Sequence, residues 1–574
     1  MQYVNRRQFI TGAAVGGGAL LAGSLVGCQA KQPASSGEAA QNVTDNIDAG
    51  VLDKRWAFEI APDPIDDKKI TKTIDAEIVV VGAGTAGLCT AVSAAEAGAK
   101  VVLFAMGSGP VGRGGSNFAF HSKYRESLGL APVEAFPYLQ RHILGCGYDI
   151  DQDKWYKWYK NSEKTMDWMI DIMAETGEYQ LSLEQVTHDG SDDISSLEYQ
   201  PVATHGWTGG SNPELGVGDG QPVVVERLAQ KAEELGVELY WNTRALQLVR
   251  GGVANGTNGR VDGIIAEDAN GDYVKFSASK AVVLATGDFS RNRDMVAKYA
   301  PQAYDWITNF DADDSFNPED GKVYGGLYEG DGQRMGLWVG AAWQKSYPNA
   351  AMAGTRFAGA DDIGILLNSE GKRFMAETLA GTWATNAYKH LAGKEMYQIW
   401  DSAYAETGAP WPKRKTGYGD ALLTPDEMIA GWDKNVEDGK YIKADTVEEA
   451  IEKLGLPAST IDEINRYNEF AHNGEDGDFH KWKGFLRSIE KGPFYGCAGS
   501  PKITFLCLMG GLRTDLNMRV CDAEDKPIPG LYNVGTMVGD AYGVTYSLRL
   551  PGQNLGMNCV CFGYLTGKYI VENE

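Results

Sequence analysis

Three glycines near the start of the chain have the spacing of residues that bind a phosphate. Gly82, Gly84 and Gly87 follow the apolar run Ile78–Val81, and a helix is expected over residues 88–97. In this order, glycines permit a tight turn, a close approach of the backbone to a pyrophosphate, and close packing of the helix on the strand. The N-terminus of that helix directs free N–H groups at the phosphates. The pattern favours dinucleotide binding, and the alternative is a purely structural glycine turn.

The elements around these glycines predict an α/β fold. The run Lys100–Phe104 supplies a second strand, so the start of the chain has the pattern of a βαβ unit. A strand at 281–289 runs into another small-residue turn, and from residue 301 to about 420 loops rich in Gly, Trp, Tyr and Asp indicate a second domain. The other expected elements are helices at 152–177, 222–234, 446–454, 457–473 and 554–572, strands at 236–240, 245–249 and 261–265, and a hairpin at 255–259.

The first 28 residues have the pattern of a twin-arginine export signal. Asn5–Ile10 contains two arginines and precedes a glycine- and alanine-rich apolar run that reaches Val26. Leu25–Cys28 resembles a lipoprotein cleavage box with Cys28 as the lipidated residue, and the alternatives are a signal cut elsewhere or kept as an anchor. Residues 29–49 have the small and polar composition of a flexible tether. The sequence therefore predicts an extracytoplasmic protein whose membrane attachment would be an N-terminal lipid anchor.

Charge and cysteine content exclude several classes of function. The chain has 53 Lys and Arg against 77 Asp and Glu, and its net charge of −24 argues against nucleic-acid binding and against a basic lipid-binding patch. Its eight cysteines include no CxxC, no CxxCH and no ferredoxin spacing, so no metal site is expected and buried thiols are the default. An iron–sulfur cluster assembled from distant cysteines is the less favoured alternative.

Nine segments spread over residues 75–574 resemble one family of flavoproteins. They are VVVGAGTAG (79–87), GRGGSN (112–117), ELGVELYWNTR (234–244), AVVLATGDFS (281–290), GDGQRMGLWVGA (330–341), GILLNSEGKRF (364–374), MGG (509–511), PGLYNVGTMVGDAYG (529–543) and PGQNLGMNCVCFGYLTGKYI (551–570). The family is that of the soluble fumarate reductases and flavocytochromes c, with the urocanate reductases and ketosteroid dehydrogenases. No haem-attachment motif accompanies the resemblance, so a haem domain is expected to be lacking.

The resemblance implies a specific domain plan. It implies an α/β, Rossmann-like FAD-binding domain with an inserted α+β capping domain, non-covalent FAD, and substrate at the interface of the two domains. The expected boundaries are 1–28 for the signal, 29–74 for a linker, 75–300 and 436–574 for the two parts of the FAD-binding domain, and 301–435 for the cap.

Carried over residue by residue, the family's cofactor contacts fall in several regions. The glycine turn would hold the pyrophosphate, the loop at 114–116 would run beside the flavin ring, and the strand end at 285–287 would pack on the cofactor. The positive end of the final helix would face flavin N1 and O2. The cofactor-binding residues so predicted are Gly82, Gly84, Thr85, Ala86, Gly87, Gly114, Gly115, Ser116, Ala285, Thr286, Gly287, Gly535, Asp540, Asn554 and Leu555. Two departures are visible: residues 104–106 lack the ribose-binding acid, and Thr536 replaces the usual Glu.

The substrate side departs much further from the fumarate reductases. The family's His-Pro aligns with Tyr347-Pro348, and its proton-donating Arg with Tyr404 or the next residue. A further His aligns with Cys507, and of the carboxylate-binding arginines only Arg549 is kept. Without the proton-delivery chain, the enzyme should reduce fumarate poorly, so that specific assignment is rejected.

Tyrosines replace charge here, which favours a larger, partly aromatic substrate. The favoured reaction is reduction of an activated C=C, with hydride from flavin N5 to the β-carbon and a proton from a tyrosine, whose ordinary pKa of about 10 suits a general acid at neutral pH. Arginine would polarise the carbonyl or carboxylate. The predicted catalytic residues are Tyr404, Arg549, Tyr347, Arg356 and Tyr546, and further candidates are Tyr542, Trp207, Ser211 and Asn212. The alternative for each tyrosine is aromatic packing.

Two other functions stay open at this point. The first is FAD-dependent dehydrogenation of the ketosteroid-dehydrogenase type, which also uses tyrosines as acid and base. The second is a non-catalytic flavin-binding lipoprotein. Because the sequence has no motif for a built-in electron carrier, a reductase would need a separate donor, a membrane cytochrome or quinol oxidase. It would then serve as a terminal reductase of anaerobic respiration acting on a small molecule.

Overall fold

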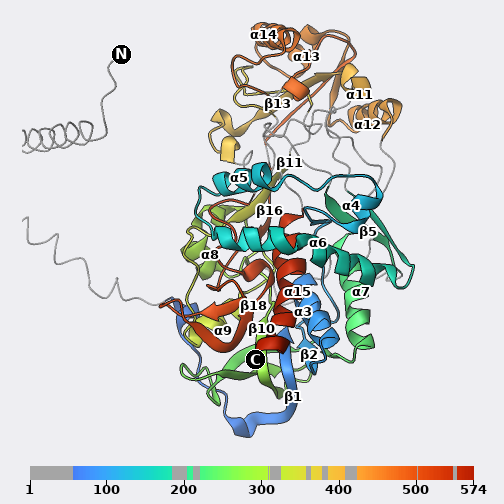
Figure 1. The fold of residues 1–574 in the computed structure, drawn as a ribbon. Coiled ribbons are helices and arrows are strands. Elements are labelled where there is room, and N and C mark those ends of the chain that lie inside the picture. Colours follow the sequence, from blue (N-terminus) through green and yellow to red (C-terminus); the bar gives the residue numbers. More distant parts are fainter. Residues whose placement is uncertain are drawn as a thin grey trace, which may run out of the picture. The chain divides into compact units, whose positions relative to one another are not determined.

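The computed structural model describes residues 56–183, 203–210, 220–307, 309–310, 325–356, 363–377, 386–407, 423–481, 483–500, 502–546 and 552–574 (Figure 1). Residues Ala57–Glu574 form one compact unit. The predicted export signal, lipidation box and tether, and the predicted site residues Ser211, Asn212 and Arg549, lie outside the described residues. No helix within these ranges has both the length and the apolarity needed to cross a bilayer.

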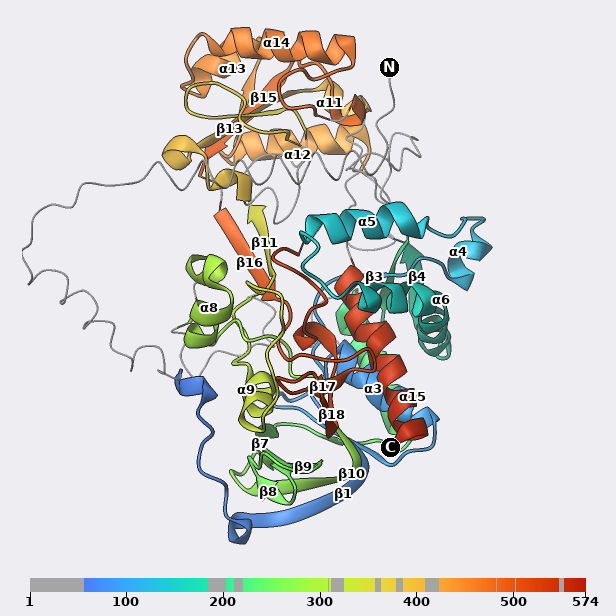
Figure 2. The ribbon, with the colours of Figure 1, turned by 60° about the vertical axis from the view of Figure 1, so that its left-hand side comes forward.

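The central sheet is the largest sheet of the described residues; it is mixed, with the order β6–β2–β1–β10–β9–β7–β8, and β18 pairs with β10 and β17. Figure 2 shows β1, β7, β8, β9 and β10 of this sheet together. β1 is parallel to β2 and β10, and β10 is parallel to β18, so these strands end at one edge. The strands are β1 (Ile70–Val81), β2 (Val101–Phe104), β6 (Glu238–Tyr240), β7 (Arg244–Arg250), β8 (Val253–Ala254), β9 (Val261–Glu267), β10 (Tyr273–Leu284), β17 (Arg519–Cys521) and β18 (Pro527–Asn533). The end of β1 is fully buried, as expected for a parallel strand covered on both faces, and the predicted α/β fold is confirmed.

Helices α3 (Thr85–Glu96) and α15 (Phe562–Asn573) lie side by side on one face of this sheet (Figure 2). Their backbones approach closely because α15 contributes glycines: a Cβ at Gly563 would lie 2.8 Å from the Ala86 carbonyl oxygen, and one at Gly567 would lie 2.1 Å from Ser93 Oγ. α15 continues a π-helix, η8 (Leu555–Cys561), and the last helix therefore begins where the sequence predicts. Single-turn π-helical segments often occur at functional sites.

Other helices and two smaller sheets complete this part of the fold. They include the helices α4 (Lys123–Ser127), α5 (Ala135–Gly145), α6 (Gln152–Ala174), α7 (Gln221–Glu234), α8 (Arg293–Tyr299) and α9 (Asp331–Trp338). Two further sheets run in the orders β3 (Asn117–Phe118), β5 (Thr204–Gly209), β4 (Tyr179–Leu183), and β11 (Ala351–Arg356), β16 (Lys502–Leu508). The predicted helices at 152–177 and 222–234 correspond to α6 and α7.

A separate antiparallel sheet, in the order β12–β13–β15–β14, forms the capping region. Its elements are β12 (Ile365–Leu367), β13 (Met396–Asp401), β14 (Ile442–Ala444), β15 (Phe494–Gly499), α11 (Ala403–Thr407), α12 (Pro425–Glu437), α13 (Val447–Lys453) and α14 (Thr460–Asn473). Residues from all the strands share one hydrophobic core. The expected boundary at residue 435 falls inside this core, so the segment 442–499 belongs with the cap and not with the central sheet.

The expected linker at 29–74 also ends earlier than the sequence suggests. Phe58 is buried in a hydrophobic cluster with Phe289 and Met295, and its carbonyl oxygen accepts a hydrogen bond of 2.8 Å from Trp338 Nε1. β1 begins at Ile70. The described residues before position 75 are therefore part of the folded unit.

Four buried charged side chains hold the cap together. Arg373 donates to Glu377 Oε1 at 2.7 Å and to Asp476 Oδ2 at 2.8 Å, and Lys481 Nζ lies 3.4 Å from Glu377 Oε2. Lys481 also donates to the Tyr467 hydroxyl at 3.0 Å. Each of these charged side chains is at most 2% exposed. Burial of charge is tolerated here because every charge has opposite partners and hydrogen bonds.

Asp476→Asn is expected to destabilise the cap by about 3–5 kcal/mol, because it removes one of the negative charges that pair with the buried Arg373 guanidinium. Asp438→Asn is the matched control, since Asp438 pairs with Lys434 at the surface and should leave stability unchanged. Limited proteolysis of the 363–499 region under increasing urea measures the difference. Equal resistance of the two variants would contradict the assigned importance of this cluster.

Candidate functional site

A cavity of about 1270 Å³ lies at the edge where the parallel strands end. Its walls include the loops after β1, β2, β10 and β18, at residues 82–86, 104–109, 285–288 and 534–536. Ligands of open α/β sheets bind at this edge because loops and helix N-termini converge there. The volume exceeds the roughly 300–1,000 Å³ of an ordinary ligand pocket, so it has room for a dinucleotide and a small substrate.

The three glycines of the turn have different tasks. A Cβ at Gly82, whose φ is +110°, would lie 2.3 Å from the Ala285 carbonyl oxygen, and one at Gly87 would lie 2.0 Å from the Gly82 carbonyl oxygen. A Cβ at Gly84 would meet only the Val111 carbonyl oxygen, at 3.7 Å, so Gly84 faces open space in the cavity wall. Gly84 caps α3 without a side-chain hydrogen bond, which leaves the first N–H groups of the helix for an anion. This cradle fits a pyrophosphate.

The loop at 112–117 is held between α3 and α7. Thr85 Oγ1 donates to Gln221 Oε1 at 2.7 Å, and the Gln221 N–H donates to the Gly114 carbonyl oxygen at 3.0 Å. A Cβ at Gly114, whose φ is +89°, would lie 3.2 Å from Leu555 Cδ1 at the start of η8. The predicted cofactor residues that line the cavity are Gly82, Gly84, Thr85, Ala86, Gly114, Gly115, Ser116, Ala285, Thr286, Gly287, Gly535, Asn554 and Leu555. Gly87 lies behind this lining.

At the end of β10, a small residue makes space for an aromatic ring. Gly287 has a φ of +81°, and a Cβ there would lie 2.9 Å from Tyr328 Cδ2, so the Tyr328 ring packs directly on this glycine. Thr286 Oγ1 accepts a hydrogen bond of 3.1 Å from the Gly332 N–H at the start of α9. These contacts join β10 to the segment that carries Tyr328.

Gly287→Ala is expected to displace the Tyr328 ring and to add about 1–3 kcal/mol of backbone strain. Gly236→Ala is the matched control, because Gly236 has a similar φ of +83° but no neighbour within 4 Å. The midpoint temperature of thermal unfolding should fall in both variants, whereas the visible spectrum of bound flavin should change only in Gly287→Ala. Identical spectra would contradict the contact.

Asp540, predicted to bind the cofactor, lies outside the cavity lining. One of its carboxylate oxygens, Oδ1, accepts hydrogen bonds of 2.8 Å from the N–H groups of Lys345 and Ser346. Its role is to anchor that turn, which explains why an acid stands there. The prediction was wrong because an Asp in a glycine-rich segment gives no sign of which direction its side chain takes.

The cavity wall near the end of β2 is polar despite the missing acid. The Asn242 N–H donates to the Gly107 carbonyl oxygen at 2.7 Å, and the Thr243 N–H donates to the Ala105 carbonyl oxygen at 2.8 Å. Asn242 and Thr243 line the cavity together with Arg244, whose Nε lies 3.0 Å from Asp331 Oδ2. The turn after β6, Arg244 at the start of β7 and Asp331 of α9 therefore supply polar groups to the cavity wall near the end of β2.

The structure separates the predicted catalytic tyrosines. Tyr404 is buried in the cap core, where its hydroxyl donates to the Arg487 carbonyl oxygen at 2.9 Å, and Tyr347 is 57% exposed. Neither lines the cavity, so both predictions are corrected to a packing residue and a surface residue. Tyr546 does line the cavity, and its hydroxyl accepts a hydrogen bond of 3.4 Å from the Asn554 N–H.

Two further candidates, Tyr542 and Trp207, do not line the cavity. Tyr542 is buried behind Tyr546, with ring centroids 4.8 Å apart, and Trp207 is buried outside the cavity lining. Arg356 belongs to β11, but its side chain is outside the described part of the structure. Within the described residues, no group of His, Cys, Asp and Glu side chains is arranged to hold a metal ion.

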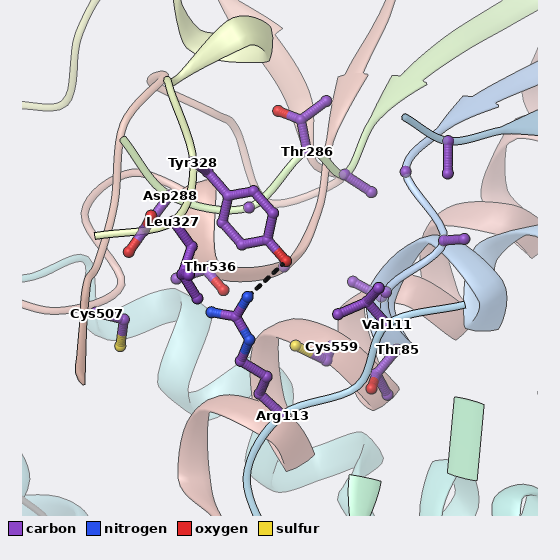
Figure 3. Close-up of a pocket in the computed structure, with 18 of the residues that line it drawn as sticks. Thr85, Val111, Arg113, Thr286, Asp288, Leu327, Tyr328, Cys507, Thr536 and Cys559 are labelled. Carbon is purple, nitrogen blue, oxygen red and sulfur yellow. Dashed lines mark hydrogen bonds between the residues drawn. The ribbon is translucent and has the colours of Figure 1, made fainter. Parts of the chain in front are cut away.

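Sequence reasoning missed Arg113 and Tyr328, which project into the cavity (Figure 3). Arg113 Nη2 donates to the Tyr328 hydroxyl at 3.4 Å, and the guanidinium lies 5.1 Å from the centre of that ring. Cys507, which replaces the family His, lines the same cavity. The signal for Arg113 was its type: one long cation inside a loop of otherwise small residues.

Comparisons with known proteins agree with this geometry. The profile of a family described as FAD binding domain matches residues 77–555. A vinyl phenol reductase of Lactiplantibacillus plantarum is 27% identical over 86% of this chain and 94% of its own. A 3-oxosteroid 1-dehydrogenase of Mycolicibacterium smegmatis is 31% identical over 65% of each chain. The crystal structure of a 3-ketosteroid-Δ4-(5α)-dehydrogenase of Rhodococcus jostii shares the fold, with a TM-score of 0.64, 22% identity and coverage of 88% of this chain and 99% of its own.

Proposed function

The chain belongs to the family of FAD binding domains, and from this premise we propose that it reduces an activated C=C bond of an enoate or enone more aromatic than fumarate. It binds FAD and is an oxidoreductase that acts on CH–CH and C=C groups. One observation carries the finer proposal: a single cavity extends from the glycine turn at Gly84 to a phenol, Tyr546, and a thiol, Cys507. In this proposal, cofactor and substrate would share one cavity.

When bound and reduced, FAD would supply hydride to such a bond. The chain must then deliver a proton to the α-carbon, and Tyr546 is the proposed donor. Burial raises the pKa of Tyr546, so its hydroxyl stays protonated, and the Asn554 N–H fixes its position. Arg549 and Arg356, whose side chains lie outside the described part of the structure, stay candidates for further contacts with the substrate. Proton donation by a positioned acid typically contributes a factor of about 10²–10⁴ to the rate.

The raised pKa of Tyr546 leads to a prediction for the pH profile. A general acid is active when protonated, and a phenol whose pKa lies above its ordinary value of about 10 keeps its proton at higher pH. The turnover number should therefore show no alkaline decline up to roughly pH 10. A fall in turnover of an otherwise stable enzyme near pH 8 would contradict Tyr546 as the donor.

The proposed function is tested by anaerobic turnover of the flavin-loaded protein with reduced methyl viologen as electron donor. Fumarate, urocanate, itaconate, hydroxycinnamates, vinyl phenols and enone steroids are the substrates, and mass spectrometry identifies the products. From an aromatic enoate or enone we expect a product that is two hydrogen atoms heavier than the substrate, and from fumarate we expect little product. If fumarate is reduced best, or if no alkene is reduced, the proposal fails.

We further propose that the protein is exported by the twin-arginine pathway and serves as a terminal reductase in anaerobic respiration. The support is the sequence of residues 5–28, and the electron donor would be a separate membrane cytochrome or quinol oxidase. Replacing Arg6 and Arg7 by Lys should retain the protein in the cytoplasm of the producing cell. Unchanged export of that variant would contradict the pathway.

Dehydrogenation of a saturated ketone is the second candidate, and one observation favours it. The 3-oxosteroid 1-dehydrogenase has a higher sequence identity to this chain than the vinyl phenol reductase has, although its match covers a smaller share of this chain. In that direction Tyr546 would interact with the substrate oxygen or accept a proton. Bleaching of the oxidised flavin by a saturated ketosteroid, with no alkene reduced, would establish the dehydrogenase instead.

A further inference from the structure

Arg113 and Tyr328 bring a cation and a hydroxyl to one point in the cavity (Figure 3). Arg113 comes from the glycine-rich loop that faces Leu555, and Tyr328 comes from the segment before α9. The hydrogen bond of 3.4 Å between them, together with the packing of the ring on Gly287, fixes the positions of both groups. Two donors held side by side by different loops form a ready binding point for a substrate oxygen.

The charge of Arg113 reaches across to the strand β16. Burial raises the pKa of both the Asp288 carboxyl and the Cys507 thiol, and the Arg113 charge opposes that rise in each. The Asp288 carboxylate accepts hydrogen bonds from the Ser290 N–H and hydroxyl and from the Leu508 N–H. These hydrogen bonds occupy the Asp288 carboxylate with backbone and Ser290 groups. Figure 3 shows the Arg113 guanidinium pointing into the space between Tyr328 and Cys507.

Sulfur atoms form the wall beside this binding point. Cys507 Sγ lies 3.8 Å from Met352 Sδ and 3.7 Å from Met509 Sδ, and Cys559 lines the same cavity. Thioethers and neutral thiols are apolar, polarisable groups that contact aromatic rings favourably. Because burial raises the pKa of the Cys507 thiol and keeps it protonated, the thiol is a poor nucleophile, and an electrophilic alkene can lie against it without alkylating the sulfur.

We propose that Arg113 and Tyr328 together bind the conjugated oxygen of the substrate, a carboxylate or phenolate, while its aromatic ring packs on the sulfur wall formed by Met352, Cys507 and Met509. This inference rests on the proposed function and names its substrate class: an aryl-substituted alkene bearing one oxygen acceptor. In an enoate, hydride added to the β-carbon moves negative charge onto the carboxylate oxygen. In a vinyl phenolate, protonation of the terminal vinyl carbon gives a quinone methide, and hydride addition to the carbon next to the ring returns the negative charge to the oxygen. A guanidinium and a phenol placed there stabilise the charge, and loss of one such donor typically costs a factor of about 10²–10³ in rate.

The test separates binding from turnover. Oxidised, flavin-loaded protein is titrated with 3-phenylpropanoate, 4-ethylphenol and the neutral 3-phenylpropanamide, and binding is followed by the visible flavin spectrum. The variants are Arg113→Met, Arg113→Lys and Tyr328→Phe, with Arg466→Met as a control because Arg466 pairs with Asp478 at the surface of the cap. FAD content and thermal unfolding are recorded for each variant.

We expect the wild type and Arg466→Met to bind the acid or the phenol at least tenfold more tightly than the amide. Arg113→Met should lose that preference with its FAD content unchanged, and Arg113→Lys should keep part of it. The ligand that shows the preference distinguishes a carboxylate from a phenolate substrate. Tyr328→Phe should lower the affinity for the preferred ligand by a smaller factor than Arg113→Met does.

The inference is overturned if Arg113→Met retains the preference, if it loses FAD instead, or if the wild type prefers the amide or binds none of the three ligands. Failure of the reductase proposal looks different. In that case the reduced wild type transfers no electrons to any alkene, whatever the binding titrations give. Reduction of alkenes by Arg113→Met at the wild-type rate would overturn the inference while leaving the reductase proposal intact.

Discussion

Tyr546→Phe should lower the turnover number for alkene reduction by about 10²–10⁴-fold, the usual contribution of a positioned general acid. Tyr546 lines the cavity with its hydroxyl oriented by the Asn554 N–H, and no other tyrosine among the predicted catalytic residues of the described chain does so. FAD content should stay unchanged, because phenylalanine keeps the ring contact with Tyr542. Steady-state turnover with an artificial electron donor measures the loss.

Tyr542→Phe is the matched control for this substitution. Tyr542 is the same residue type, is equally buried and touches the Tyr546 ring, but it lies outside the cavity lining. We expect it to retain turnover within a factor of a few. If both variants lose activity equally, the effect comes from packing. If neither loses it, the proton has another source.

Gly84→Ala should weaken FAD binding by roughly 10–100-fold, the equivalent of the about 1–3 kcal/mol that one added carbon costs in close packing. The added methyl group would meet no protein atom closer than 3.7 Å and would occupy the space that faces the cavity. The backbone at Gly84 has φ −79° and ψ 175°, which alanine adopts without strain. The apoprotein should therefore fold normally, and fluorescence titration with FAD measures the affinity.

Gly431→Ala provides the control for Gly84→Ala. Gly431 lies within α12, and a Cβ there would meet nothing within 4 Å. FAD affinity should equal that of the wild type. Normal FAD affinity in Gly84→Ala would show that the cofactor does not approach this glycine.

The central sheet and the glycine turn could be predicted because their signals are local. An apolar run, three spaced glycines and a helix pattern occur within some twenty residues, and this spacing alone is typical of a phosphate-binding turn. The cap boundary could not be predicted in the same way. β14 is only Ile442–Ala444, and its partner β15 lies at Phe494–Gly499, so the pairing that assigns both to the cap is non-local.

The substrate side was less accessible to sequence reasoning for a similar reason. Tyr404 and Tyr546 are the same residue type, and only tertiary packing decides that one bonds to the Arg487 carbonyl oxygen in a core while the other faces the cavity. Arg113 lies inside a motif that was interpreted through its glycines. Its partner Tyr328 is distant in sequence, and no local pattern connects the two.

Reoxidation of the reduced flavin by candidate alkenes is the most direct test of the central claim. Protein without residues 1–28 is loaded with FAD, reduced without oxygen, and mixed rapidly with each alkene while the visible flavin band is followed. The account predicts fast return of the oxidised spectrum with an aromatic enoate, vinyl phenol or enone, and slow return with fumarate. No return with any alkene, while a saturated ketone bleaches the oxidised enzyme, would contradict it.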